Sequence, residues 1–170
     1  MSKIKNQPRI KNALVVKVRE QLEHRAMWLA LLAEEAEMKG LDPVTYGREA
    51  IFKCGQMQGR KLTGGTTSFK QLRKNLFTKP AQWMFEMKIK DCDDDKLSID
   101  FHYCPLVAAW QKMGLDDETI ARLCDTAMCG DRGIASQFGG VLNLNKVIAK
   151  GDPICEIRFC KAEIQEKEKE

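Results

Sequence analysis

The segment from Leu97 to Pro105 reads Leu-Ser-Ile-Asp-Phe-His-Tyr-Cys-Pro, and the predicted fold depends on the transition that it contains. Apolar residues alternate with polar ones as far as Tyr103, a period of two that indicates a half-buried strand. Pro105 then opens a helical pattern. Residues 83–90 alternate in the same way. Because only the acidic turn 91–96 separates the two runs, they predict a β-hairpin.

The other elements follow from helical spacing, capping residues and a second pair of alternating runs. Asp42 before Pro43 is a helix start signal. The expected helices cover residues 10–38, 43–57, 68–77, 105–113 and 117–129. The expected strands of the second hairpin cover residues 141–149 and 154–159. The first helix should bury the apolar residues that recur at helical spacing, namely Leu14, Val18, Leu22, Ala26, Leu29 and Ala33. Residues 1–9 should be frayed, and residues 61–67 should form a loop.

These elements predict an α+β fold in a single domain. Two hairpins make a four-stranded antiparallel sheet with two short helices between them, and the N-terminal helices pack on the sheet. Within residues 1–170, we expect mainly helical support in 1–80, the sheet and the site in 81–160, and a charged tail in 161–170.

The net charge of +4 is unevenly distributed along the chain. Residues 1–90 contain 18 Lys and Arg against 8 Asp and Glu, and residues 91–170 contain 10 against 16. A basic half is compatible with nucleic-acid binding, but aromatic residues are not interleaved with these charges as they are in single-strand binders. We therefore expect a solvated helical surface and no nucleic-acid partner.

The start of the chain is polar and shows no secretory signal, and the best apolar window, residues 26–33, is followed at once by two glutamates. No membrane partner is therefore expected. Seven cysteines without an export signal indicate a reducing cytoplasm, where thiols are buried, ligating or catalytic.

Cys104 is the leading candidate for a catalytic residue. It lies where the strand ends and a helix begins, so free backbone N–H groups and the helix dipole favour a thiolate. His102, two residues earlier, is a candidate base or orienting group. The alternative is that Cys104 is a small buried hydrophobic residue and His102 a surface residue.

A second group of candidates includes the compact segment Gly130-Asp131-Arg132-Gly133. Arg132 suits bidentate binding of a substrate carboxylate, and Asp131 suits the role of general base or ligand. Asp125 is a second candidate for substrate binding. The alternative is an ion pair that fixes a turn.

Three cysteines form a candidate metal site, with zinc or manganese as the divalent ion. Cys104, Cys124 and Cys155, together with His102 or Asp125, provide suitable ligand types. Their spacings are long and contain no Cys-x-x-Cys pair, and both Cys124 and Cys155 fall on apolar faces by periodicity alone. Ligation and burial in the core both stay open.

Four segments, taken in order, resemble the L-2-amino-thiazoline-4-carboxylic acid hydrolase family. They are Phe-His-Tyr-Cys-Pro-Leu-Val at 101–107, Leu-Cys-Asp at 123–125, Gly-Asp-Arg-Gly at 130–133 and Gly-Asp-Pro-Ile-Cys-Glu-Ile-Arg-Phe at 151–159. The resemblance is specific over residues 83–160. The last segment is also similar to the end of 4-vinyl-reductase-type small-molecule-binding domains, which can carry zinc.

The hydrolase resemblance implies that water opens a cyclic amidine or thiazoline and yields a carbamoylated amino acid. The residues that stand in its matching motifs are Cys104, Cys124, Asp125, Asp131, Asp152 and Cys155.

We therefore expect a hydrolase that acts on a non-peptide carbon–nitrogen (or carbon–sulfur) bond in a small ring. Its substrate should bear a carboxylate. Cys104 would be nucleophile or metal ligand, and His102 or Asp131 would transfer the proton. The alternative is a non-enzymatic module whose cysteines hold a structural zinc or line a small-molecule pocket. The long first helix fits a homodimer contact and packing on its own sheet equally well.

Overall fold

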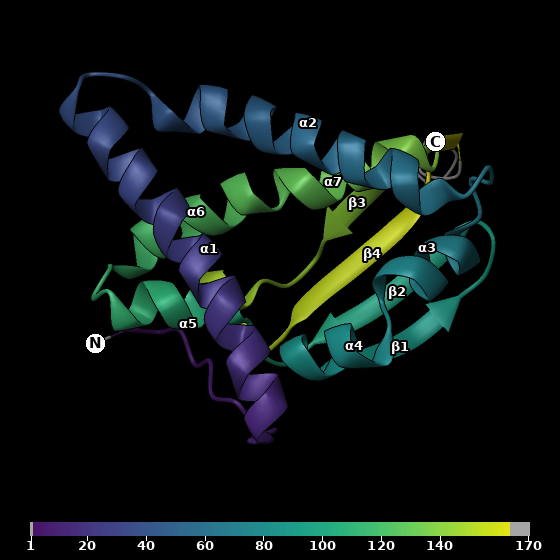
Figure 1. The fold of residues 1–170 in the computed structure, drawn as a ribbon, viewed down its shortest axis with the longest axis horizontal. Coiled ribbons are helices and arrows are strands. Elements are labelled where there is room, and N and C mark those ends of the chain that lie inside the picture. Colours follow the sequence, from purple (N-terminus) through teal and green to yellow (C-terminus); the bar gives the residue numbers. More distant parts are fainter. Residues whose placement is uncertain (1, 164–170) are drawn as a thin grey trace.

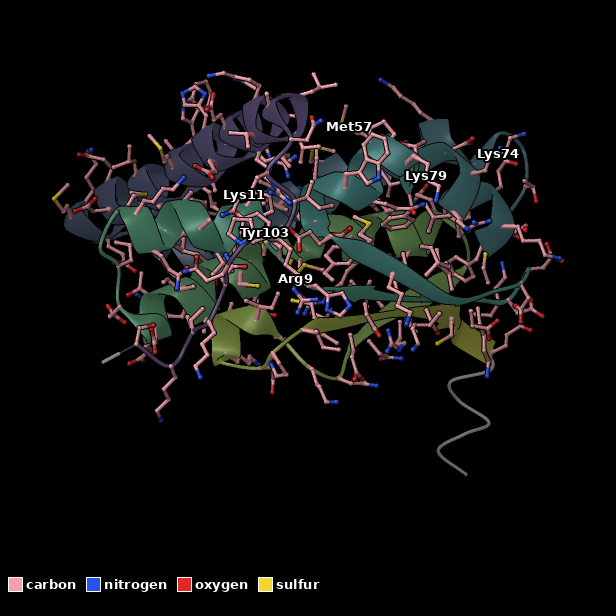
Figure 2. The ribbon with its side chains drawn as sticks, turned by 90° about the horizontal axis from the view of Figure 1, so that it is seen from below. Arg9, Lys11, Met57, Lys74, Lys79 and Tyr103 are labelled. Atoms are coloured by element: carbon pink, nitrogen blue, oxygen red, sulfur yellow. The ribbon has the colours of Figure 1, made fainter. Side chains whose placement is uncertain are left out.

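The computed structural model describes residues 2–163 and has the predicted α+β fold. One antiparallel sheet has the strand order β1-β2-β4-β3, and the helices gather on one of its faces (Figures 1 and 2). The strands are β1 (Met87–Cys92), β2 (Lys96–Phe101), β3 (Gly140–Leu144) and β4 (Cys155–Lys161). The helices are α1 (Ala13–Met38), α2 (Pro43–Thr63), α3 (Phe69–Leu76), α4 (Lys79–Phe85), α5 (Pro105–Lys112), α6 (Asp117–Ala127), α7 (Cys129–Gln137) and the 3-10 turn η1 (Ile148–Lys150).

The register of the central strands places the apolar residues of both on the helix-covered face. Ile99 of β2 pairs with Ile157 of β4, and both side chains are buried. Phe159, two residues further along β4, has its ring centroid 6.0 Å from that of Phe69 on α3. Trp110 of α5 is fully buried, and its indole N–H donates to a backbone carbonyl of α1 at 2.9 Å. The alternation read from the sequence therefore identified the core face of the sheet correctly.

Three predicted helix starts are confirmed by capping hydrogen bonds. The side chains of Asp42, Ser68 and Asp116 each accept a backbone N–H from two or three residues further on. A free N–H at a helix start needs such an acceptor, which explains why these residue types mark the starts.

Several predicted boundaries are wrong. Residues 83–85 belong to α4 and not to the first strand, because Lys79-Pro80 opens a helix where it was expected only to end one. The residue between α4 and β1, Glu86, has a left-handed φ of 51°. The expected strand 141–149 ends at Leu144, and α2 continues past Gly59 to Thr63. The predicted tail lies outside the described residues from position 164 onward, and β4 extends to Lys161. In residues 2–163, no helix has the length and apolar content needed to cross a bilayer.

The buried face of α1 also differs from the prediction. Leu14 and Val18 are exposed, whereas Val15, Arg19 and Ala30 are buried. Periodicity alone selected a stripe to one side of the true one, because α1 carries apolar residues around most of its circumference.

A buried ion pair explains why an arginine lies on the inner face of α1. The Arg19 guanidinium lies 3.1 Å from the Glu86 carboxylate and 4.3 Å from the ring centroid of Tyr103. Its other N–H groups donate to backbone carbonyls of Ile10, Trp83 and Met84. Glu86 in turn accepts the backbone N–H groups of Arg9 and Ile10. Paired and hydrogen-bonded in this way, the two charges can remain buried.

The same network anchors residues 2–12, which form an ordered arm rather than the frayed end expected for residues 1–9. Ile4 and Asn6 are buried, and the backbone N–H of Lys3 donates to Asp117 at 2.7 Å. The arm therefore connects α1 to the start of both α5 and α6.

Helices α2 and α7 pack backbone to backbone. A Cβ added to Gly55 of α2 would overlap the carbonyl group of Gly130, coming within 2.7 Å of its carbon atom. A Cβ on Gly133 of α7 would come within 3.1 Å of the Cα of Gly55, and Gly59 is similarly confined by Gln137. Helices can approach this closely only where neither carries a side chain at the crossing.

We expect Gly55→Ala to lower the free energy of unfolding by roughly 2–4 kcal/mol, because the added methyl group meets rigid backbone and forces the helices apart. Gly47→Ala in the same helix is the matched control, since its Cβ would lie 3.6 Å from Thr126, an ordinary contact distance. This control should be neutral, or stabilising by up to about 1 kcal/mol through helix propensity. Urea unfolding of both variants measures the difference, and equal effects would contradict the backbone contact.

Candidate functional site

Cys104 is the N-cap residue of α5, directly after the end of β2. Its backbone is held on both sides by one buried side chain of the N-terminal arm. The Asn6 amide donates to the Cys104 carbonyl at 2.8 Å and accepts the Cys104 N–H at 2.9 Å. The position of the thiol is therefore fixed by a residue almost one hundred positions away in the sequence.

The thiol of Cys104 is neutral at rest, contrary to the expectation of a thiolate. Burial raises its pKa, and the backbone N–H groups of Leu106 and Val107 offset this only in part. The charges that act on it most strongly are those of Asp131, which raises the pKa, and Arg25, which lowers it. A nucleophilic Cys104 would consequently need a base.

Asp131 lies in the first turn of α7, between the two glycines that contact α2. Loss of hydration raises the pKa of its carboxyl group to about 6, against the opposing positive charges of Arg25 and Arg132. A carboxyl group with such a pKa exchanges its proton near neutral pH, as a general acid or base must.

Cys124 of α6 and Cys155 at the start of β4 belong to the same neighbourhood. Burial raises the pKa of Cys155 to about 12, and its sulfur accepts the Ile148 N–H at 3.2 Å. Burial also raises the pKa of Cys124 well above its ordinary value, with further contributions from Cys104, Cys155 and Asp131. These four residues, from three helices and a strand, are therefore within electrostatic range of one another.

This cluster does not fit a metal ion. Within residues 2–163, no three His, Cys, Asp or Glu side chains are arranged to hold one. The zinc or manganese ligand set of Cys104, Cys124 and Cys155 therefore does not form in this structure.

Asp125 and Arg132 bind each other. The Arg132 guanidinium donates to the Asp125 carboxylate at 2.8 Å and to the Asp125 carbonyl at 3.1 Å. The other carboxylate oxygen of Asp125 pairs with Arg48 of α2. The two expected substrate-binding residues thus join α2, α6 and α7 through ion pairs, in a helical segment and not in a turn.

His102 lies in the bend between β2 and α5 and is half-buried. Its backbone N–H donates to the Glu86 carbonyl at 3.3 Å. The charges acting most strongly on Cys104 come from other residues, so Asp131 is the better placed of the two predicted proton-transfer groups.

A cavity of about 200 Å³ adjoins the cluster on the side of β3 and η1. Cys124 lines it, with Asp125 and Arg132 at its helical wall. Lys150, at the end of η1, also lines it, and its positive charge lowers the pKa of Cys124. The cavity therefore combines a thiol, a cation and an apolar wall in a volume suited to a small ring.

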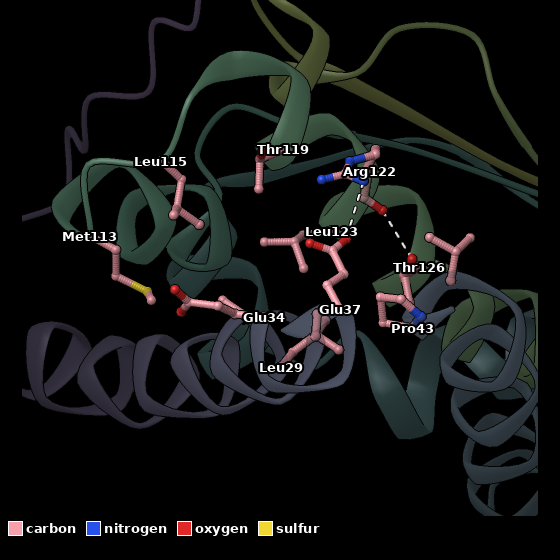
Figure 3. A pocket seen from close by; sticks show the side chains of 13 residues that line it. Leu29, Glu34, Glu37, Pro43, Met113, Leu115, Thr119, Arg122, Leu123 and Thr126 are labelled. Carbon is pink, nitrogen blue, oxygen red and sulfur yellow. Dashed lines mark hydrogen bonds and ion pairs between the residues drawn. The ribbon is translucent and has the colours of Figure 1, made fainter. Parts of the chain in front are cut away.

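A second cavity, of about 190 Å³, lies between α1, α5, α6 and the start of α2 (Figure 3). Its walls are mainly apolar, and its charged residues are Glu34, Glu37 and Arg122, the last two paired at 3.3 Å. It contains no thiol or imidazole. Of the cluster, Cys124 alone lines the first cavity, and Cys104, Asp131 and Cys155 line neither of the two.

A sequence profile of the L-2-amino-thiazoline-4-carboxylic acid hydrolases matches residues 19–159, most of the chain. The chain belongs to this family. The match begins in α1 and includes α2 and α3, so the resemblance extends well beyond residues 83–160, to which the motifs had confined it. No protein of curated function shows significant sequence similarity to this hydrolase-family chain.

The fold of this family member is also similar to a crystal structure of trafficking protein particle complex subunit 3 from Naegleria fowleri, covalently bound to palmitic acid. The TM-score is 0.52 with 16% sequence identity, over 81% of this chain and 93% of that chain. At this identity the likeness shows a shared fold alone.

Three residues of the site region in this hydrolase-family chain were missed by sequence reasoning. Asn6 lies in a segment with no periodic pattern, and Arg25 and Lys150 are single cations among 28 Lys and Arg. No local signal distinguishes them, because each gains its place from contacts across the fold.

We expect Asp131→Asn to stabilise the protein above about pH 6, by roughly 1–3 kcal/mol, and to leave it unchanged near pH 4. The folded-state pKa is raised, so ionisation of Asp131 costs stability as pH increases from about 4 through about 6, and asparagine removes that cost. Thermal unfolding of the wild-type chain and the variant at pH 4 and pH 8 measures this difference in stability.

Asp42→Asn is the control of opposite sign. Hydrogen bonds from Thr45 and Val44 lower the pKa of Asp42, so its replacement should reduce stability at neutral pH and lose its effect below about pH 4. If Asp131→Asn were destabilising at pH 8, the carboxyl group would be one that the fold stabilises in its charged form.

Proposed function

We propose that this protein opens a small cyclic amidine or thiazoline ring that bears a carboxylate, using Cys104 as nucleophile and Asp131 as the proton-transfer group. The observation that carries the proposal is the family match over residues 19–159. The neighbourhood of Cys104, Asp131, Cys124 and Cys155 supports it at the level of residues.

The first half of the reaction forms a covalent intermediate. The Cys104 sulfur adds to the amidine carbon while its proton passes to the Asp131 carboxylate. Asp131 then returns that proton to the ring sulfur as the carbon–sulfur bond of the ring breaks. The ring is now open, its carbon remains attached to Cys104, and no proton has been gained or lost.

Water completes the reaction. Asp131 accepts a proton as water adds to the carbon, and the bond to Cys104 then breaks with return of a proton to its sulfur. The product is the carbamoylated amino acid, and the net change is the addition of one water. The same pair of residues thus serves both halves.

We assign the substrate carboxylate to Lys150. Arg132 lines the same cavity but is already bound to Asp125, whereas Lys150 is exposed at the rim and lies close enough to Cys124 to lower its pKa. The apolar wall formed by Leu142, Leu144 and Val147 would exclude water from the ring.

The direct test is hydrolysis of 2-amino-thiazoline-4-carboxylate, followed by release of the product thiol and by a product mass one water heavier. Cys104→Ser and Asp131→Asn should each lower kcat/KM by about 10²-fold or more, the usual contribution of a nucleophile or general base. Cys54→Ser is the control, because Cys54 is an exposed cysteine on α2. Full activity of both site variants would refute the assignment.

The pH dependence should follow Asp131. Because the carboxylate is the active form and its pKa is raised to about 6, kcat/KM should fall about tenfold per pH unit below that value. Lys150→Met should raise KM about tenfold with little change in kcat, whereas Lys146→Met, at a lysine paired with Glu156, should change neither. A profile flat from pH 5 to 8 would exclude Asp131 as the base.

A further inference from the structure

Helix α1 exposes large apolar side chains along its length. Leu14, Trp28 and Leu32 are 70%, 62% and 67% exposed. Figures 1 and 2 show the reason, since α1 lies across the outside of the helical layer, away from the sheet. Single exposed apolar residues are common, but several that share one side of a helix indicate an interaction surface.

Seven of the exposed residues of α1, four of them apolar, follow the spacing of a coiled-coil seam. Successive members are separated alternately by four and three residues, and all are exposed. These residues, called the α1 seam below, are Leu14, Val18, Gln21, Arg25, Trp28, Leu32 and Glu35. The helix buries a different face, which carries Val15, Ala26 and Ala30. Apart from Arg25, whose charge acts on Cys104 and Asp131, the seam residues lie off the face by which α1 packs on the rest of the chain.

We propose that the α1 seam binds the α1 seam of a second copy of this chain, with the two helices antiparallel about a two-fold axis near Glu23. This pairing places Leu14 opposite Leu32 of the partner subunit, Val18 opposite Trp28 of the partner subunit, and Gln21 opposite Arg25 of the partner subunit. Each layer is then apolar against apolar or polar against polar. The two-fold symmetry repeats the three layers on the other side of the axis.

The charges select the antiparallel arrangement. In a parallel pair each seam residue faces itself, so Arg25 would face an arginine and Glu35 a glutamate, and like charges in contact oppose association. In the antiparallel pair, Glu35 stands near Lys11 of the partner subunit, just before its helix begins. The two Arg25 positions are offset by four residues, about 6 Å along the axis, with Gln21 opposite each. Parallel pairing would also place the two Lys11 side chains together.

The seam fits a second protein chain better than a lipid surface. Membrane-surface helices combine an uninterrupted apolar face with a basic polar face. Here Arg25 interrupts the apolar residues at the middle of the seam, and Glu34 and Glu35 give the C-terminal half of α1 an acidic character. Both features suit an antiparallel protein contact and oppose an anionic bilayer.

Light scattering coupled to size-exclusion chromatography of the intact chain tests the association. A dimer has about twice the 19.3 kDa chain mass. Leu32→Glu introduces two charges at the contact and should raise the dissociation constant on the order of 100-fold or more. Met57→Glu and Met38→Glu are matched controls, since these residues are 63% and 66% exposed but lie on α2 and at the end of α1 off the seam. Both controls should remain dimeric.

Disulfide trapping tests the orientation, in a Cys54→Ser background that removes the exposed thiol. Leu14→Cys mixed with Leu32→Cys should form a mixed disulfide dimer, and neither should do so alone. Antiparallel helices separate the two Leu14 positions by 18 residues, or about 27 Å.

Three results would each overturn the proposal. The first is a monomeric wild-type chain, the second a dimer that Met57→Glu dissociates and Leu32→Glu does not, and the third efficient disulfide trapping of Leu14→Cys with itself. A monomer that floats with vesicles of phosphatidylglycerol and phosphatidylcholine would assign the seam to a lipid surface instead. None of these measurements depends on turnover, so their outcome is independent of the proposed hydrolase activity.

Discussion

The backbone contact between α2 and α7 is the constraint on which the rest of the structure depends. Gly55 of α2 meets the backbone of Gly130 in α7, and Gly133 of α7 meets the backbone of α2 around Gly55, at separations that exclude a Cβ atom on Gly55 or Gly133. Gly59 is confined in the same way by Ile134 and Gln137. This crossing sets the direction in which α7 leaves α6 and thereby the position of its first turn. Asp131 lies between the two α7 glycines, so the residues that allow the crossing also place this half-buried side chain where loss of hydration raises its pKa.

A second constraint acts from the opposite side of the molecule. The buried pair Arg19–Glu86 holds the N-terminal arm against α1 and α4, and Asn6 then holds the backbone of Cys104. Burying two charges is costly unless all their donors and acceptors are satisfied, and here backbone groups of two segments, residues 9–10 and 83–84, satisfy them. The arm, the ion pair and the glycine contact together bring Cys104 and Asp131 into one neighbourhood from residues 27 positions apart.

The sequence allowed the fold class, the antiparallel sheet and most helix starts to be predicted, because alternation and capping are local properties. It did not reveal α7, since the Gly-Asp-Arg-Gly motif resembles a turn when the partner helix that requires its glycines is unknown. The inner face of α1 was predicted slightly to one side of the true one, because apolar residues surround most of the helix. Among the site residues, Cys104 and Asp131 were found by their position at element boundaries. Arg25 and Lys150 were not, because their relation to the site exists only in three dimensions.

The proposed chemistry relies on the Asp131 carboxyl group, whose burial has two effects. Its burial costs stability at neutral pH, and the same burial brings its pKa close to the value that proton transfer requires. The most direct measurement is an NMR titration of the side-chain carboxyl carbon of Asp131 in the intact chain. A titration midpoint near pH 6 is predicted. A midpoint near the ordinary aspartate value of 3.8 would show that the Asp131 carboxyl group is well hydrated, and would contradict its role in proton transfer.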